Sequence, residues 1–354
     1  MYLHNGYWAS LVGSQAVLWV AITFERLICS QWNYDAGGPD KYQSTSMRKK
    51  DDAIADHGHE QLLPANTYFA WAIDLLFNSR GIGHPWQLKT TPPAYRPDET
   101  KSNFLFWRLV SCVISFALTL GAAYQPEPPA HLLTARHVYS LRRIDEMNLE
   151  EVIFKFLSAL GFLVGIYTTV CWMANVFILF VVSTSMYDFR TCRSNFGSPL
   201  EAFTIRRFWS KLWHQYLRST LEGIADWTVD HLPTLKSHRI AARYSRILIA
   251  FLISGIVHVG CDVGARIPLS ESGAVSFFCS QALGIMIEDA VQEAYHRLFG
   301  SAKGNSPQRW VRVVGYLWVS VYMSCTLPLW SFPYLRRHEP GGSPIVPSQW
   351  IGLA

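Results

Sequence analysis

The chain has 354 residues, and its 31 Lys and Arg exceed its 26 Asp and Glu to give a formal net charge of +5. Charged residues make up only 16% of the chain and aromatic residues reach 14%, whereas a typical soluble domain is about 25% charged. This composition excludes an intrinsically disordered chain and argues against an ordinary soluble protein. The charge excess is also too small to indicate a nucleic-acid-binding protein. The seven cysteines form no CxxC pair, so we expect free thiols.

The first half of the chain holds three uncharged runs of about the length that crosses a bilayer, which is about 20 apolar residues in a helix. Met1–Phe24 lacks the basic start and the small-residue cleavage site of a signal peptide, so we expect a retained membrane helix. Leu109–Pro126 is the second run. Phe156–Tyr187 would be roughly 48 Å long as one helix. A tight hairpin that breaks near Gly161 and Gly165 is therefore an alternative to a single span.

The later apolar runs are shorter or interrupted. Ile247–Cys261 and Ser272–Ile287 are short, and Val313–Leu335 is long enough to cross the bilayer but contains Pro328, which ends or kinks a helix. Tyr68–Phe77 is too short to span and indicates an interfacial or re-entrant helix. Together the runs predict an all-α, polytopic integral membrane helical bundle with about six to eight membrane segments.

Polar stretches separate these runs. Gln31–Ala65 is expected to be a solvated loop, and His57 and His59 within it resemble half a metal site without a third ligand, so we expect no bound metal. Arg190–Arg246 concentrates Lys and Arg, which is typical of cytoplasmic loops of membrane proteins. We therefore expect this segment to face the cytosol.

The segment Leu200–Glu222 has a helical pattern with one aromatic face. Its apolar positions are Phe208, Trp209, Leu212, Trp213, Tyr216 and Leu217, and the basic residues lie mostly off this face. Such a helix could lie in the membrane interface. Alternatively, its basic residues could bind an anionic cofactor at the membrane surface, because Arg and Lys are the usual partners of phosphate.

His258 lies inside an apolar run, where a polar side chain is costly and tends to face an interior cavity. An imidazole in such a place can take a proton from a hydroxyl group. Ser254 and Gly255 precede it by one helical turn and leave room on its face for a ligand or a neighbouring helix. We predict that His258 is a general base; the alternative is a core histidine satisfied by local contacts.

Three further polar residues are candidates for the same site. His214 follows Trp213 and either hydrogen-bonds a substrate or is satisfied by interfacial water. Gln281 and Glu288 are seven residues apart and share a helix face. Glu288 either orients a histidine or binds substrate, or simply marks where its helix leaves the membrane.

Several sequence blocks resemble the wax-synthase-like branch of the membrane-bound O-acyltransferases, whose fungal members include acetyltransferases of terpenoid and meroterpenoid pathways. The blocks are GSPLEAFTIRRFWSKLWHQYLR (Gly197–Arg218), FLISGIVH (Phe251–His258) and FFCSQALGIMIED (Phe277–Asp289), in this order. LLFNSRGIGHPWQLK (Leu75–Lys89) is similar to an upstream element of the fungal members.

The resemblance implies transfer of an acyl group from coenzyme A to an alcohol, with His258 as the catalytic residue and His214 close to it. Many relatives carry Asn at the position of His214. The residues that the resemblance and the basic pattern assign to the acyl-donor site are Arg206, Arg207, Phe208, Trp209, Lys211, Trp213 and Arg218. We assign Ser254, Gln281 and Glu288 to the substrate pocket.

The expected co-substrate is acetyl-CoA, the expected acceptor is a hydrophobic terpenoid-type alcohol, and the expected location is the endoplasmic reticulum membrane, with no permanently bound cofactor. Two alternatives remain: a long-chain wax-ester synthase, and a membrane transporter without enzymatic activity. The expected regions are an N-terminal helix with a polar loop and an interfacial segment (1–103), membrane helices (104–189), the acyltransferase core (190–335) and a C-terminal tail (336–354).

Overall fold

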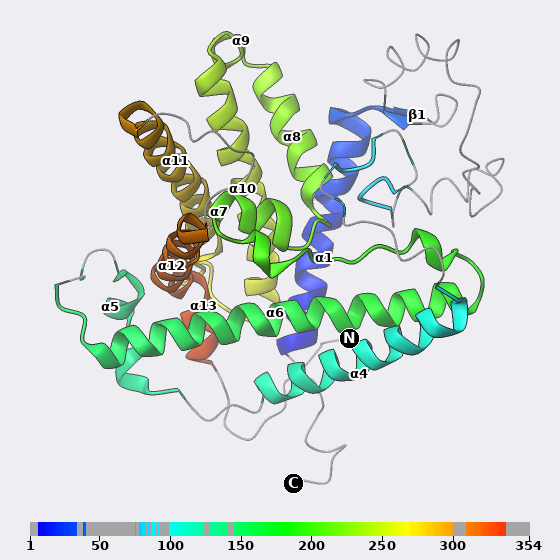
Figure 1. Ribbon diagram of the computed structural model, residues 1–354, viewed down its shortest axis with the longest axis horizontal. Helices are drawn as coiled ribbons and strands as arrows, with labels where there is room; N and C mark the ends of the chain where they lie inside the picture. The colour runs from blue at the N-terminus through cyan, green and yellow to red at the C-terminus, as the bar shows by residue number, and fades with distance from the viewer. Residues whose placement is uncertain are drawn as a thin grey trace.

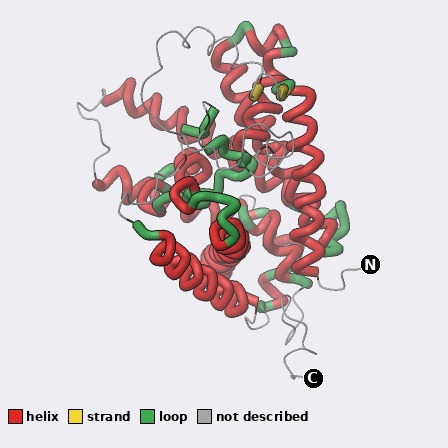
Figure 2. Tube along the Cα trace, turned by 90° about the vertical axis from the view of Figure 1, so that its right-hand side faces the viewer, coloured by secondary structure: helices red, strands yellow, loops and turns green. Residues whose placement is uncertain are grey.

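Helices make up nearly all of the regular structure (Figures 1 and 2). The computed structural model describes residues 6–33, 38–39, 75, 78–82, 84, 86–89, 91, 99–123, 128–140, 143, 145–299 and 309–337. Within these ranges the strands are limited to a two-residue antiparallel pairing of β1 (Trp32–Asn33) with β2 (Gly38–Pro39). The prediction of an all-α fold is confirmed.

The helices follow the apolar runs of the sequence, with short helical turns between them. The longer helices are α1 (Gly6–Phe24), α4 (Lys101–Ala123), α6 (Leu149–Ser183), α8 (Arg218–Asp230), α10 (Arg239–Gly264), α11 (Ala274–Phe299), α12 (Arg309–Thr326) and α13 (Pro328–Leu335). The shorter elements are η1 (Glu25–Cys29), η3 (Ala130–Leu132), α5 (Ala135–Val138), η5 (Phe189–Thr191), η6 (Pro199–Glu201), α7 (Ile205–Arg207), η7 (Phe208–Leu212) and α9 (Pro233–Lys236).

Five of the described helices are long and apolar enough to cross a membrane: α1 continued by η1, α4, α6, α10 and α11. The pair α12 and α13 forms a sixth candidate span that is bent by 51°. Pro328 stands at the start of α13, where its missing N–H costs no helical hydrogen bond. The expectation that this proline ends or kinks the last apolar run is confirmed.

The helices α1 and α10 lie side by side and antiparallel (Figure 1). Small residues let the two backbones approach closely, as in many membrane helix pairs. A Cβ atom on Gly260 would lie 2.5 Å from the carbonyl oxygen of Gly13. The Ser10 hydroxyl donates to the Cys261 carbonyl oxygen at 3.0 Å. This contact holds α1 against the face of α10 that carries Gly260 and Cys261.

The helix α6 is continuous, so the alternative of a hairpin broken near Gly161 and Gly165 is wrong. Both glycines lie in regular helix, and each costs only about 1 kcal/mol relative to alanine. No proline interrupts the segment. At about 1.5 Å per residue α6 is roughly 52 Å long, so it can cross a bilayer core of about 30 Å only at a strong tilt. In Figure 1 it runs across the direction of α1 and α10.

Polar contacts join α4 to α6 in antiparallel order. The Thr119 hydroxyl donates to the Thr168 hydroxyl at 2.9 Å. Farther along, Arg108 donates to the Asn175 side-chain oxygen at 3.0 Å. Hydrogen bonds of this kind satisfy polar groups inside the membrane and fix the register of the two helices.

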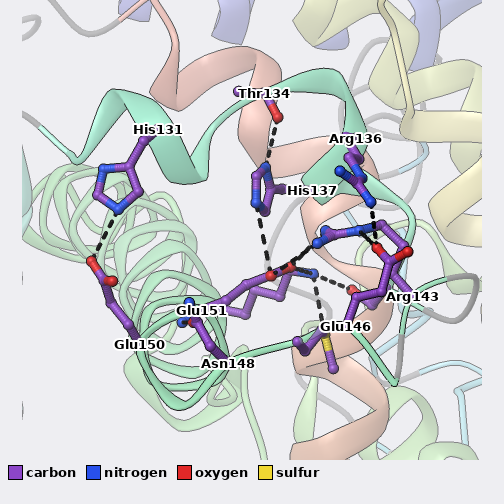
Figure 3. A network of polar contacts seen from close by, with 12 residues as sticks. His131, Thr134, Arg136, His137, Arg143, Glu146, Asn148, Glu150 and Glu151 are labelled. Carbon is purple, nitrogen blue, oxygen red and sulfur yellow. Dashed lines mark hydrogen bonds and ion pairs between the residues drawn. The ribbon is translucent and has the colours of Figure 1, made fainter.

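A charged network ties the segment before α6 to the first turns of that helix (Figure 3). Glu151 and Lys155 are buried and form an ion pair at 2.7 Å. Arg143 approaches Glu151 at 3.2 Å and His137 approaches it at 3.8 Å. The Asn148 side chain caps the helix by accepting from the Glu151 N–H. Because α5 in the same segment contacts α13, the network also supports the end of the bundle at α13.

The expected helix over Leu200–Glu222 is broken into four pieces. The Thr204 hydroxyl caps α7, and η7 follows with the wider hydrogen-bond spacing of a π-helix. The chain then turns away from helix geometry between Trp213 and Leu217 before α8 begins. The cause is Gln215, whose side-chain amide donates to the carbonyl oxygens of Trp213 and Trp209.

Some sequence predictions fall on parts of the chain that the structure does not describe. Tyr68–Phe77 lies outside the described residues except for residue 75, and His57 and His59 lie outside them as well. Within Gln31–Ala65 only residues 31–33 and 38–39 are described.

Candidate active site

His258 lies deep in the bundle, on the face of α10 that points toward α11 and α13. Its ring stacks on Phe278 of α11 with ring centroids 4.3 Å apart. It meets Trp330 of α13 edge-on at 5.0 Å. The ring is nevertheless only half-buried. An aromatic wall therefore surrounds a titratable side chain that keeps some accessible surface.

The two ring nitrogens of His258 have different surroundings. Nδ1 lies 2.7 Å from the backbone carbonyl oxygen of Ser254. A carbonyl oxygen can only accept a hydrogen bond, so Nδ1 carries the proton in the neutral ring. Nε2 then holds a lone pair, and it makes no hydrogen bond within the part of the chain that the structure describes. This is the arrangement that a general base requires.

The space that the sequence predicted beside His258 is occupied by a neighbouring helix. Gly255 packs against α11, and a Cβ atom at this position would lie 2.8 Å from the Cα of Val275. Ser254 is buried, and its backbone carbonyl oxygen lies against Nδ1 of His258. Of the two alternatives for this face, the close helix packing is the one observed.

His214 lies in the non-helical turn between η7 and α8, among aromatic rings. Its ring centroid is 5.7 Å from those of Phe196 and Trp213 and 6.0 Å from that of Tyr216. Burial, together with the smaller electrostatic effect of His258, lowers its pKa to about 3. The two histidines are thus close enough to interact electrostatically, and His214 is neutral at physiological pH. Its Nδ1 is buried and has no hydrogen-bond partner in the described chain.

Trp209 and Gln281 connect the aromatic walls around the two histidines. The Trp209 ring packs on Phe278 of α11, with centroids 5.7 Å apart. Its indole N–H donates to the Gln281 side-chain oxygen at 3.3 Å. Gln281 is fully buried, and its amide also donates to the Thr326 hydroxyl of α12 at 3.2 Å. The predicted pocket residue Gln281 therefore links η7, α11 and α12 directly beside Phe278.

Asp262 lies one helical turn beyond His258 and is not among the residues predicted from the sequence. Its Oδ1 accepts from the Trp330 indole N–H at 2.9 Å and from the Tyr334 hydroxyl at 2.7 Å. Its Oδ2 accepts from the Ser272 hydroxyl. The carboxylate is buried and fixes the Trp330 ring that contacts His258. An acid inside an apolar span, four residues after the histidine, is the signal that could have found it.

Glu288 holds α7 on α11. Its Oε1 accepts from the Ile205 N–H at 2.5 Å and from the Trp318 indole at 3.0 Å. Its Oε2 accepts from the Arg206 N–H at 3.2 Å. A carboxylate at a helix N-terminus satisfies amide groups that have no partner within the helix. The structure gives Glu288 this capping role rather than a contact with either histidine.

Comparisons with known proteins identify the family of this fold. Residues 192–280 match the model of the membrane bound O-acyl transferase family. The chain is also 32% identical to acetyltransferase pyr8 of Aspergillus fumigatus over 305 residues. This alignment covers 80% of this chain and 67% of the relative. The chain belongs to the membrane-bound O-acyl transferase family.

Further relatives of this acyltransferase are also named acetyltransferases. The chain is 29% identical to acetyltransferase ataH of Aspergillus terreus over 290 residues, which make up 78% of this chain and 93% of the relative. The chain is 27% identical to acetyltransferase TRI7 of Fusarium sporotrichioides over 292 residues, which make up 78% of this chain and 66% of the relative. No solved structure matches the chain. The resemblance seen in the sequence and the predicted enzyme class, a membrane acyltransferase, are confirmed.

Most of the basic residues that the sequence assigned to donor binding in this acyltransferase form internal ion pairs. Arg206 pairs with Asp289 at 2.6 Å. Arg218 pairs with Glu222 at 2.7 Å, and Arg207 pairs with Glu201. The structure thus offsets their charges with acids of the protein, and the remaining predicted cation in this set is the exposed Lys211.

Proposed function

We propose that the protein is an acetyltransferase that moves the acetyl group of acetyl-CoA to a hydroxyl group of a hydrophobic, terpenoid-type alcohol in the endoplasmic reticulum membrane. The observation that carries this proposal is the orientation of His258. Its Nδ1 is held by the Ser254 carbonyl, which leaves Nε2 as a base within an aromatic wall. The names of the relatives support the acetyl donor.

In the proposed reaction the alcohol oxygen attacks the carbonyl carbon of the thioester while Nε2 of His258 accepts the hydroxyl proton. The carbon–sulfur bond then breaks, and the departing thiolate takes the proton from the imidazolium ring. A thiol has a pKa near ~8.5, so it leaves far more easily than an alkoxide. The acetyl group passes directly between the two substrates in a ternary complex.

His214 is proposed to bind the acyl carbonyl oxygen. Because its pKa is about 3, the ring is neutral and presents one N–H donor and one acceptor. A neutral N–H donor directed at this oxygen stabilises the negative charge that develops on it. An asparagine side chain can donate in the same way. This role therefore agrees with the Asn that the family resemblance implies at this position.

We assign the reaction to residues 190–335, and the match of residues 192–280 to the family model supports this assignment. Both histidines and the aromatic walls lie in this region, together with the acid that fixes Trp330.

Incubation of microsomes with labelled acetyl-CoA and a pool of terpenoid alcohols tests the proposal. Membranes that contain the protein should form labelled ester, and control membranes should not. Palmitoyl-CoA added in competition should inhibit little, because bulky aromatic side chains close the wall around His258. A preference for palmitoyl-CoA would favour the wax-ester synthase, and uptake of an alcohol without ester formation would favour the transporter.

A further inference from the structure

A group of arginines lies near Tyr216, whose ring is also a neighbour of the His214 ring. Arg80 is buried, with 8% of its surface exposed, and its guanidinium lies 5.8 Å from the centre of the Tyr216 ring. It donates to the carbonyl oxygens of Ser194 at 2.6 Å and of Arg193 at 3.2 Å. Arg108 of α4 is close enough to interact electrostatically with Arg80.

A tight turn holds Arg80 in this place. The Asn78 side chain accepts from the Ile82 N–H at 2.7 Å. Gly81 has a φ of 61°, and any Cβ atom there would meet the Trp86 ring at 2.6 Å. The Ser219 hydroxyl of α8 donates to the Ser79 carbonyl at 2.6 Å. The turn is therefore fixed to α8, which begins at Arg218, two residues after Tyr216.

The charges of Arg80 and Arg193 are not offset by acids. Neither forms an ion pair with a carboxylate in the described chain, and the Nε of Arg193 is buried without a hydrogen-bond partner there. Burial lowers the pKa of both guanidinium groups, and the charge of Arg193 lowers that of Arg80 further. Arginine stays protonated even so. A buried charge without a counterion costs several kcal/mol, so the place of buried Arg80, with the half-buried Arg193 beside it, is electrostatically suited to an anion.

The basic residues of α7 and α8 differ from Arg80 and Arg193 in having acidic partners. Arg206, Arg207 and Arg218 each have a carboxylate partner within the protein. An incoming phosphate would have to displace those acids, whereas at Arg80 and Arg193 it would meet donors without a competing carboxylate.

We propose that Arg80 and Arg193 bind phosphate groups of the coenzyme A donor, at the entrance to the site that contains His214 and His258. The inference rests on the proposed function and moves the donor phosphates away from the predicted basic residues of α7, η7 and the start of α8. From Arg80 the rings of Tyr216 and His214 follow in sequence, with centroids 6.0 Å apart, and His214 interacts electrostatically with His258. Tyr216 is thus a shared neighbour of Arg80 and His214, so phosphates held at Arg80 would lie one aromatic residue away from His214.

Two donors, the wild type and three variants test the inference. Acetyl-CoA carries the nucleotide phosphates and acetyl-pantetheine lacks them. Arg193→Gln should raise KM for acetyl-CoA by about 10- to 100-fold, the loss expected for a hydrogen bond between charged groups. KM for acetyl-pantetheine and for the alcohol should not change. Arg80→Gln should also raise KM for acetyl-CoA. Arg193→Gln is the decisive variant, because Arg80 also donates to two backbone carbonyl oxygens and its loss could disturb the local structure.

Arg246→Gln is the matched control, because Arg246 is an arginine already paired with Asp226 at 2.9 Å and Asp230 at 3.0 Å. Its KM for acetyl-CoA should equal that of the wild type. Equal effects of Arg193→Gln on both donors, or no effect on either, would overturn the inference.

Binding of coenzyme A without reaction separates the two proposals. Coenzyme A should raise the thermal midpoint of the purified wild type in detergent but not that of Arg193→Gln. If the wild type binds coenzyme A in this way but forms no ester, the proposed function fails and the phosphate site stands. If phosphatidic acid in the micelle stabilises the wild type and coenzyme A does not, the arginines bind a lipid headgroup and the inference is wrong.

Discussion

At the scale of single residues, one backbone hydrogen bond determines what His258 can do. The Ser254 carbonyl fixes the proton on Nδ1, so the opposite nitrogen is the only one that can act as a base in the neutral ring. Trp330 and Phe278 hold the ring plane, and Asp262 in turn holds Trp330. A substitution at His258 should therefore change chemistry more than structure.

Replacement of His258 by alanine should lower turnover by roughly 10²- to 10⁴-fold, the usual contribution of a general base. His258→Gln should be equally inactive, because an amide cannot take the proton. The amount of protein in the membrane and the affinity for coenzyme A should change little, and both are measured alongside the rate of ester formation. His214→Asn serves as the internal control and should keep measurable activity. An active His258→Ala together with an inactive His214→Asn would show that the other histidine is the base.

The neutral state of His214 predicts a pH dependence of stability. Its pKa is about 3 in the folded protein and 6.5 in an unfolded chain. Between these values the unfolded chain binds a proton that the folded protein does not, so this stability is complete above pH 6.5 and is lost on acidification. At pH 5 the loss from this residue is about 2 kcal/mol. Thermal unfolding in detergent should show a larger fall between pH 7.5 and pH 5 for the wild type than for His214→Asn. Equal falls would contradict the burial of a neutral ring.

At the scale of elements, the close contact of α1 with α10 depends on glycines, such as Gly13 and Gly260, that have no side chain at the interface. Gly260→Ala should lower the free energy of unfolding by about 1–3 kcal/mol, because its Cβ would overlap the Gly13 carbonyl. The change is measured as the thermal midpoint of the purified protein. Gly161→Ala in α6 is the matched control, since nothing lies within 4 Å of the added Cβ there. This control should be neutral or slightly stabilising, because alanine favours helix by about 1 kcal/mol. Equal midpoints for the two variants would mean that α1 and α10 do not pack as described.

The membrane helices could be predicted from the sequence because the bilayer sets the length of an apolar run. Pro328 likewise indicated the bend between α12 and α13. The break after η7 could not be predicted from periodicity. It depends on Gln215, whose amide binds two backbone carbonyls of the preceding turn and offers the chain an alternative to helix. The continuity of α6 could not be predicted either. A glycine in the sequence can mark the break of a helix, or it can lie within a continuous helix on a face that no neighbour contacts, as Gly161 and Gly165 do.

At the scale of the whole molecule, the distribution of charge predicts the orientation in the membrane. The N-terminal end of α10 carries Arg239, Arg243 and Arg246, so the hairpin of α8, α9 and α10 should face the cytosol. In sealed microsomes an impermeant thiol reagent should label Ser237→Cys, at the exposed end of α9. Ser270→Cys, in the exposed turn at the other end of α10, should react only after the membrane is opened. The reverse pattern would overturn this orientation.

The sequence predicts only the part of the candidate site that can be recognised within one segment of the chain. His258 stood out because a polar residue interrupts an apolar run. The partners that give the site its geometry come from distant parts of the chain. Tyr334 reaches Asp262 from 72 residues away, and Arg80 reaches Ser194 from 114 residues away. A single sequence does not show which of its acids and arginines meet, so the paired and unpaired cations could not be told apart.

The close packing of α1 on α10 has a consequence for biogenesis. Ser10 and Cys261 are hydrogen-bonded although 251 residues separate them in the sequence. At a synthesis rate of about 5–20 residues per second, α1 precedes its partner by roughly 10–50 s. The helices α4 and α6 are neighbours in the chain and can pair within that interval. During it the small-residue face of α1 is exposed to lipid or to the insertion machinery. A nascent chain that stalls before α10 thus carries an unmatched helix face that membrane quality control can recognise.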